Sequence, residues 1–197
     1  MEPTSGSLDR EATEGSSRGA LFMALFGAIG ATAGARALDG AARIVLLVIS
    51  LVLAGALCLG AVRLRQGARD LSFDNSPRAR TRRKHVSRRF NLVFGLEGIA
   101  IALAVVLLGR YGMGTFIPAV VALIVGLHFF PLAGLYGVKV YYLTGAALCA
   151  VALVAFWVAP SARLQLVGLG SAAVLFATAA YILALGGKAR RSGAPAP

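Results

Sequence analysis

The sequence predicts an all-α fold, a polytopic membrane bundle of six transmembrane helices with both termini in the cytoplasm. Composition supports this first: 58% of the 197 residues are hydrophobic, only 14% are charged, and the mean hydropathy is +0.77. A soluble domain is about half apolar and about a quarter charged, so this chain has too few polar residues to cover a water-facing surface. The charges are also clustered, which leaves long uncharged runs between them.

Six of these runs are long enough to cross the membrane, because a helix rises about 1.5 Å per residue and the hydrocarbon core is ~30 Å thick. None alternates apolar and polar residues as the ~10-residue strands of a membrane β-barrel do. A helix also pairs its own backbone groups, which lipid cannot do. We therefore predict a membrane domain over 19–187, with spans at about 19–35, 43–62, 90–109, 114–133, 140–159 and 164–185.

Polar segments flank and interrupt this domain. Residues 1–18 are rich in Ser, Gly and Glu and predict a disordered cytoplasmic tail. Residues 63–89 predict a basic cytoplasmic loop, and 188–197 a second cytoplasmic tail.

The first apolar run has two interpretations. Its length and the small residues Ala33 and Ala35 fit a cleaved secretory signal, but four acids and only two arginines precede it, where a signal carries net positive charge. Gly27, Gly30 and Gly34 instead give the small-residue spacing that lets membrane helices approach closely. We favour a retained span, and expect this face to hold a second copy in a homodimer or another membrane partner.

The distribution of basic residues sets the orientation. With the amino terminus inside, sixteen of the twenty bases fall on inner segments and four on outer ones. Cytoplasmic loops of membrane proteins carry such an excess of Lys and Arg. Both ends are therefore predicted to be cytoplasmic.

The net charge of +12 raises nucleic acid as a partner. Ten of the twenty bases, however, lie between Arg63 and Arg89, bracketed by apolar runs, which argues against that class. The expected partners are the lipid bilayer and its anionic head groups. The basic residues predicted to contact these head groups are Arg78, Arg80, Arg82, Arg83, Lys84, Arg88 and Arg89.

Two ionisable side chains stand out inside the spans. Glu97 is the only acid there and His128 the only histidine, and both lie roughly 10 Å from the inner ends of neighbouring helices. Such residues are costly in hydrocarbon and are functional-site candidates. The pair could handle a proton or bind a ligand. Alternatively, it is an interhelical hydrogen bond that fixes the hairpin, or Glu97 reaches Arg88 or Arg89.

Other chemistry has no sequence signal. The chain has no HExxH zinc motif, nucleophile elbow or phosphate loop, so we expect no enzyme, no cofactor and no catalytic residue. Cys58 and Cys149 sit in apolar runs without metal-ligand spacing, and we expect them to pack as small apolar residues and to hold no metal.

The segments FNLVFGLEGIAIALA and VGLHFFPLAGLYGVKVYYLTG, within Phe90 to Gly145, carry an E-G and an L-H-F-F-P-L-A pattern. In this respect the chain resembles a group of small multipass proteins of the bacterial inner membrane with no assigned activity. The resemblance implies a bacterial cytoplasmic (inner) membrane location and draws attention to Gly98 and Pro131 beside the pair. Pro131 is also expected to end or kink the fourth span and to free backbone carbonyls near His128.

These observations favour a small bundle that binds or passes a small solute or a proton. A non-catalytic scaffold or accessory subunit is the alternative, and a lipid-modifying enzyme the third. A water-filled cavity reaching Glu97 would favour transport, whereas a dry core with an exposed groove on the first span would favour the scaffold.

Overall fold

The computed structural model describes residues 5–67 and 77–192, and this part of the chain is almost entirely helical. A short 3-10 turn, η1, precedes the fourth helix. The elements are α1 (Ser5–Ala35), α2 (Gly40–Gly67), α3 (Pro77–Arg110), η1 (Gly114–Phe116), α4 (Ile117–Tyr136), α5 (Val140–Trp157) and α6 (Pro160–Ser192).

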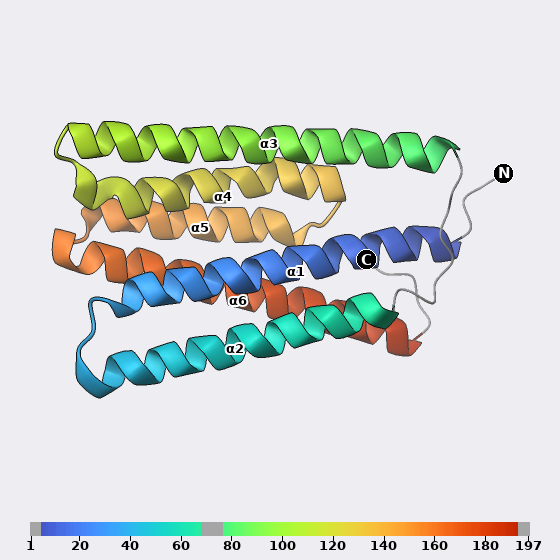
Figure 1. Cartoon of the computed structure of the whole chain (residues 1–197), viewed down its shortest axis with the longest axis horizontal. Coiled ribbons are helices and arrows are strands. Elements are labelled where there is room, and N and C mark those ends of the chain that lie inside the picture. Colours follow the sequence, from blue (N-terminus) through green and yellow to red (C-terminus); the bar gives the residue numbers. More distant parts are fainter. Residues whose placement is uncertain (1–4, 68–76, 193–197) are drawn as a thin grey trace.

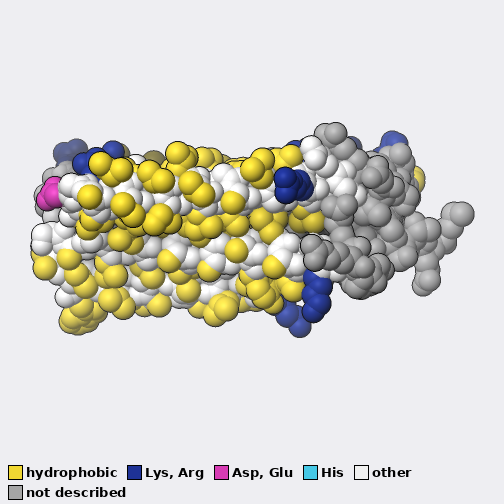
Figure 2. Space-filling view, turned by 90° about the horizontal axis from the view of Figure 1, so that it is seen from below, with side chains coloured by type: hydrophobic (Ala, Val, Ile, Leu, Met, Phe, Trp, Pro, Cys, Tyr) yellow, Lys and Arg dark blue, Asp and Glu magenta, His cyan; other side chains and the backbone are white. Residues whose placement is uncertain are grey.

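All six α-helices are long and apolar enough to cross a membrane, which confirms the predicted class of multipass membrane protein. The shortest candidate span is Val140–Trp157, with 18 residues, and the longest is Pro160–Lys188, with 29. Figure 2 shows hydrophobic side chains along the middle of the surface and Lys and Arg side chains near its two ends. This pattern fits a protein surrounded by lipid, with its charged ends in water.

The helices run up and down, so the ends of α1 and α6 that carry the termini lie at the same end of the bundle (Figure 1). Helix α1 packs along α6 and also contacts α2, while α4 packs on α5. Helix α3 lies at one edge and packs on α4, and none of the apolar window of its span is buried. Which end faces the cytoplasm stays a prediction from the basic residues.

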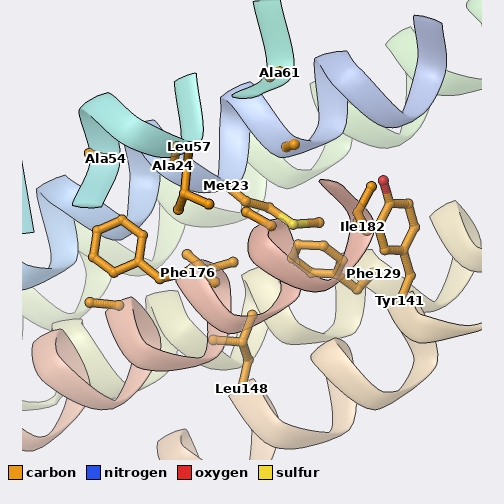
Figure 3. Packing of buried hydrophobic residues seen from close by; sticks show 14 of the residues in the cluster. Met23, Ala24, Ala54, Leu57, Ala61, Phe129, Tyr141, Leu148, Phe176 and Ile182 are labelled. Atoms are coloured by element: carbon orange, nitrogen blue, oxygen red, sulfur yellow. The ribbon is translucent and has the colours of Figure 1, made fainter. Parts of the chain in front are cut away.

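The main core lies where α1, α2 and α6 meet α4 and α5 (Figure 3). Alanines on α1 and α2 allow the helices to approach, and larger side chains fill the space between them. The larger buried residues of this core are Met23, Leu57, Phe129, Tyr141, Leu148, Leu175, Phe176 and Ile182.

Glycines bring α1 and α6 into backbone contact. A Cβ atom added to Gly30 would lie 3.0 Å from the carbonyl oxygen of Gly168, and one added to Gly34 would lie 2.9 Å from the amide nitrogen of Leu169. At Gly27 the added atom would lie 2.7 Å from the ring of Phe176. All three glycines thus lie where α1 packs on α6. The face expected to hold a second copy, however, is covered by α6 of the same chain.

Several predicted boundaries were wrong, because polar segments also form helix. Helix α1 begins at Ser5, inside the tail predicted to be disordered, and α6 continues to Ser192, into the predicted second tail. Helix α2 extends to Gly67 and α3 begins at Pro77, so most of the predicted 63–89 loop is helical; residues 68–76 lie outside the described part. Arg, Leu, Glu and Ala are good helix formers, and Pro is favoured at the first helical position.

Candidate functional site

Glu97 on α3 and His128 on α4 face each other across the α3–α4 contact. The Nδ1 atom of His128 lies 3.1 Å from Oε2 of Glu97, and 9% and 12% of the two side chains are exposed, respectively. Helix α3 ends at Arg110, and the chain reverses direction in a turn at Gly112, whose φ is 70°. Helix α4 then runs antiparallel beside α3. The short turn and the similar depth of the two residues therefore bring them together, as the sequence indicated.

The alignment of this contact is poor, although its length is that of a hydrogen bond. Nδ1 of His128 is buried and, among the described residues, has no partner that meets hydrogen-bond geometry. A hydrogen bond weakens steeply when the N–H does not point at its acceptor. The two groups thus touch, but the contact leaves Nδ1 of His128 without an aligned hydrogen bond.

Aromatic rings surround the histidine. Phe94 and Phe129 each meet the His128 ring nearly edge-on, with centroids 6.4 and 6.2 Å away. Phe90 stacks on Phe94 and lies edge-on to Tyr136. Such rings exclude water, and their faces favour a nearby positive charge.

Gly98 and Pro131, the two residues expected to support the pair, have different surroundings. An added Cβ at Gly98 would meet no atom within 4 Å, so Gly98 does not pack against the pair. Pro131 lies inside α4, which continues to Tyr136, so it does not end the helix, and the alternative expectation of a kink stays a prediction. Because proline lacks an N–H, the carbonyl of Leu127, four residues earlier, still loses its helical partner one position before His128.

Glu97 contacts His128 rather than the arginines at the start of α3. Arg88 and Arg89 are exposed on α3, as are Arg80 and Lys84. The side chains of Arg78, Arg82 and Arg83 lie outside the described part, although their backbone belongs to α3. Their contact with anionic lipid stays a prediction.

Arg163 is a site that the sequence interpretation missed. It is 4% exposed and lies over the Phe116 ring, 4.0 Å from the centroid. Its Nε donates to the carbonyl of Ala155 at 2.8 Å, and its Nη2 to that of Val158 at 3.0 Å. Its Nη1 lies 3.2 Å from Oγ1 of Thr115. The side chain therefore joins η1 to the α5–α6 turn. Its isolation was a signal, since no other charged residue occurs between Lys139 and Lys188.

Cys149 packs against a small residue of the neighbouring helix. A Cβ added to Gly126 on α4 would lie 2.7 Å from the Sγ atom of Cys149 on α5. In the described part of the chain, no group of three or more His, Cys, Asp or Glu side chains could hold a metal ion.

The fold and this contact define a multipass helical membrane protein with one ionisable pair between two of its helices. Residues 91–185 match a family model described as a family of unknown function (DUF7010). This match spans most of α3 to most of α6 and contains both Glu97 and His128; it assigns no activity. No curated protein and no solved structure matches the chain.

Proposed function

We propose that the protein binds a proton at the Glu97–His128 contact and that this binding accompanies the passage of a proton or a small solute across the membrane. The observation that carries the proposal is the buried Nδ1 of His128, which lies 3.1 Å from a carboxylate oxygen without an aligned hydrogen bond. A contact that served only to hold two helices together would gain most from full alignment. Here the imidazole keeps unused capacity to donate or accept a proton.

The position of α3 supports this proposal. Because α3 packs mainly along α4 and also contacts the adjoining η1, small movements of α3 would open the contact without disturbing the α1–α6 core. Ionisable residues inside membrane helices commonly mark proton and ion pathways. The proposal places the protein in a bacterial cytoplasmic membrane, following the resemblance of its central segments, and assigns no bond-making chemistry to the chain.

A scaffold or accessory subunit is the second candidate. Two shallow surface grooves favour it, because neither reaches the pair. One is lined by Lys84, Ser87, Arg88 and Asn91, and the other lies near Val158 and Gly170 at the opposite end. Against it, α1 offers no free groove, because its small-residue face is covered by α6.

Proton flux into proteoliposomes separates the two candidates. The purified full chain is reconstituted around a pH-sensitive dye, and a potassium gradient with valinomycin drives proton entry. We expect Glu97→Gln to abolish the flux and Thr32→Val, which removes a polar group on α1 away from the pair, to retain it. Wild-type flux no faster than that of empty liposomes, with and without a panel of small solutes, would contradict the proposal and favour the scaffold.

A further inference from the structure

One face of α3 is not covered by any other described part of the chain (Figure 1). At about 100° of rotation per residue, this face lies opposite Glu97, which points at α4. All of its residues are exposed, and they recur every three or four positions. They are Lys84, Arg88, Asn91, Gly95, Gly98 and Ala102.

The beginning of this face carries four polar residues around a shallow, open groove. Lys84, Ser87, Arg88 and Asn91 line a groove with a volume of about 480 Å³. Within the described ranges, neither Lys84 nor Arg88 forms an ion pair, and the one acid of α3 faces the other way. An ammonium, a guanidinium, a hydroxyl and an amide together offer donors suited to phosphate oxygens.

Toward the middle of the helix, the same face continues as a strip of small residues. Cβ atoms added to Gly95 or Gly98 would meet no atom within 4 Å, and Ala102 extends the strip by another turn. Exposed Leu92 and Phe94 stand on its two sides. From Gly95 to Ala102 the strip runs roughly 10 Å along the helix, much of the depth of one leaflet.

From this continuity we infer that the outer face of α3 binds one anionic glycerophospholipid lengthwise. The phosphate group lies in the groove at Lys84 and Arg88, and an acyl chain lies along Gly95, Gly98 and Ala102. A small-residue strip could also receive α3 of a second copy, but a two-fold axis along the membrane normal would then place Lys84 and Arg88 beside their own copies. Like charges at such an interface are repulsive, whereas an anionic head group is complementary.

The first test compares lipids on the purified full chain in a neutral detergent, with binding measured by native mass spectrometry. The probes are dioleoyl phosphatidylglycerol, dioleoyl phosphatidylcholine with the same chains, and inorganic phosphate. We expect phosphatidylglycerol to bind, phosphatidylcholine to bind more weakly, and inorganic phosphate neither to bind nor to compete. Equal binding of the two lipids, or full competition by inorganic phosphate, would overturn the inference.

Variants separate the two parts of the site. Lys84→Ala and Arg88→Ala should each weaken phosphatidylglycerol binding roughly five-fold, since a basic residue near anionic lipid contributes about 1 kcal/mol. Gly98→Leu fills the strip and should weaken binding several-fold without unfolding the protein, because nothing lies within 4 Å of the added atom. The matched controls are Arg110→Ala, at the other end of α3, and Gly55→Leu, at an equally open site on α2.

Two results would refute the acyl-chain part of the site. Gly98→Leu could bind phosphatidylglycerol as tightly as Gly55→Leu does, which would leave only diffuse surface electrostatics. Alternatively, the lipid-free protein could be a dimer that Gly98→Leu splits and Gly55→Leu does not, which would assign the face to a second copy.

Discussion

Replacing Gly168 with alanine tests the packing that holds α1 on α6. The added Cβ atom would lie 2.5 Å from the amide nitrogen of Gly34 and 2.6 Å from the carbonyl oxygen of Gly30. Ordinary contacts to carbon are about 3.5 Å, so the two helices must separate by roughly 1 Å. Both neighbours are backbone atoms of a helix, and neither can rotate away as a side chain could.

The expected cost follows from this geometry. Overpacking a close interface costs about 1–3 kcal/mol, while alanine regains up to about 1 kcal/mol of helix propensity over glycine. Gly168→Ala should therefore lower the free energy of unfolding, by up to about 2 kcal/mol. Gly55→Ala on α2 meets no atom within 4 Å and should be neutral or slightly stabilising.

A thermal melt in mild detergent measures this difference, with unfolding followed by thiol labelling of Cys58 and Cys149, which are free and half-buried. We expect Gly168→Ala to melt at a lower temperature than the wild type and Gly55→Ala to melt at the same temperature or above it. If Gly168→Ala were as stable as Gly55→Ala, α1 would not pack on α6 as described.

Three further predictions follow from the same structure. Glu97→Gln and His128→Leu should have non-additive effects on stability in the same melt, with a coupling of about 0.5–3 kcal/mol. The reason is that either single change leaves one polar group without its neighbour. Additive effects would show that the contact is absent. Arg163→Leu should lower the free energy of unfolding by at least about 2 kcal/mol. Arg163→Lys should restore little of it, because lysine cannot reproduce the planar set of donors of the guanidinium. Full stability of Arg163→Lys would contradict the described hydrogen bonds. A topology reporter at Gly112 should be external and one at the carboxyl terminus cytoplasmic, and the opposite pattern would invert the orientation.

The sequence predicted the six spans because long apolar runs have few alternatives in lipid. It did not predict where the helices end, as at Ser5 and Pro77, because polar segments rich in helix formers can extend a span into water. It also could not say which helices pack together. Leucines that face lipid and leucines that face protein are chemically alike, so Gly30 and Gly34 signalled a close contact without identifying α6 as the partner.

The residues of the candidate site also differ in how far the sequence predicts them. The sequence offered the contact between Glu97 and His128 as one possibility, because two isolated polar residues at one depth on adjoining helices can meet, but it left Arg88 and Arg89 open as other partners of Glu97. The burial of Arg163 could not be predicted, since a base in a short outer turn is ordinarily assigned to water. Two of its partners, the carbonyls of Ala155 and Val158, are near in the sequence, but Thr115 lies 48 residues earlier, and only the folded chain brings it to Arg163.

The central claim is that Glu97 and His128 exchange a proton as one unit, and infrared spectroscopy tests it most directly. Glu97 is the only acid within the spans, so a carboxylic-acid band that appears on acidification in wild type and is missing in Glu97→Gln belongs to this residue. We expect His128→Leu to shift the pH midpoint of this band, because the two groups are 3.1 Å apart. Phe130→Leu, which removes an aromatic ring two residues after His128 on α4, should leave the pH midpoint of the band unchanged. A midpoint identical in wild type and His128→Leu would contradict the account.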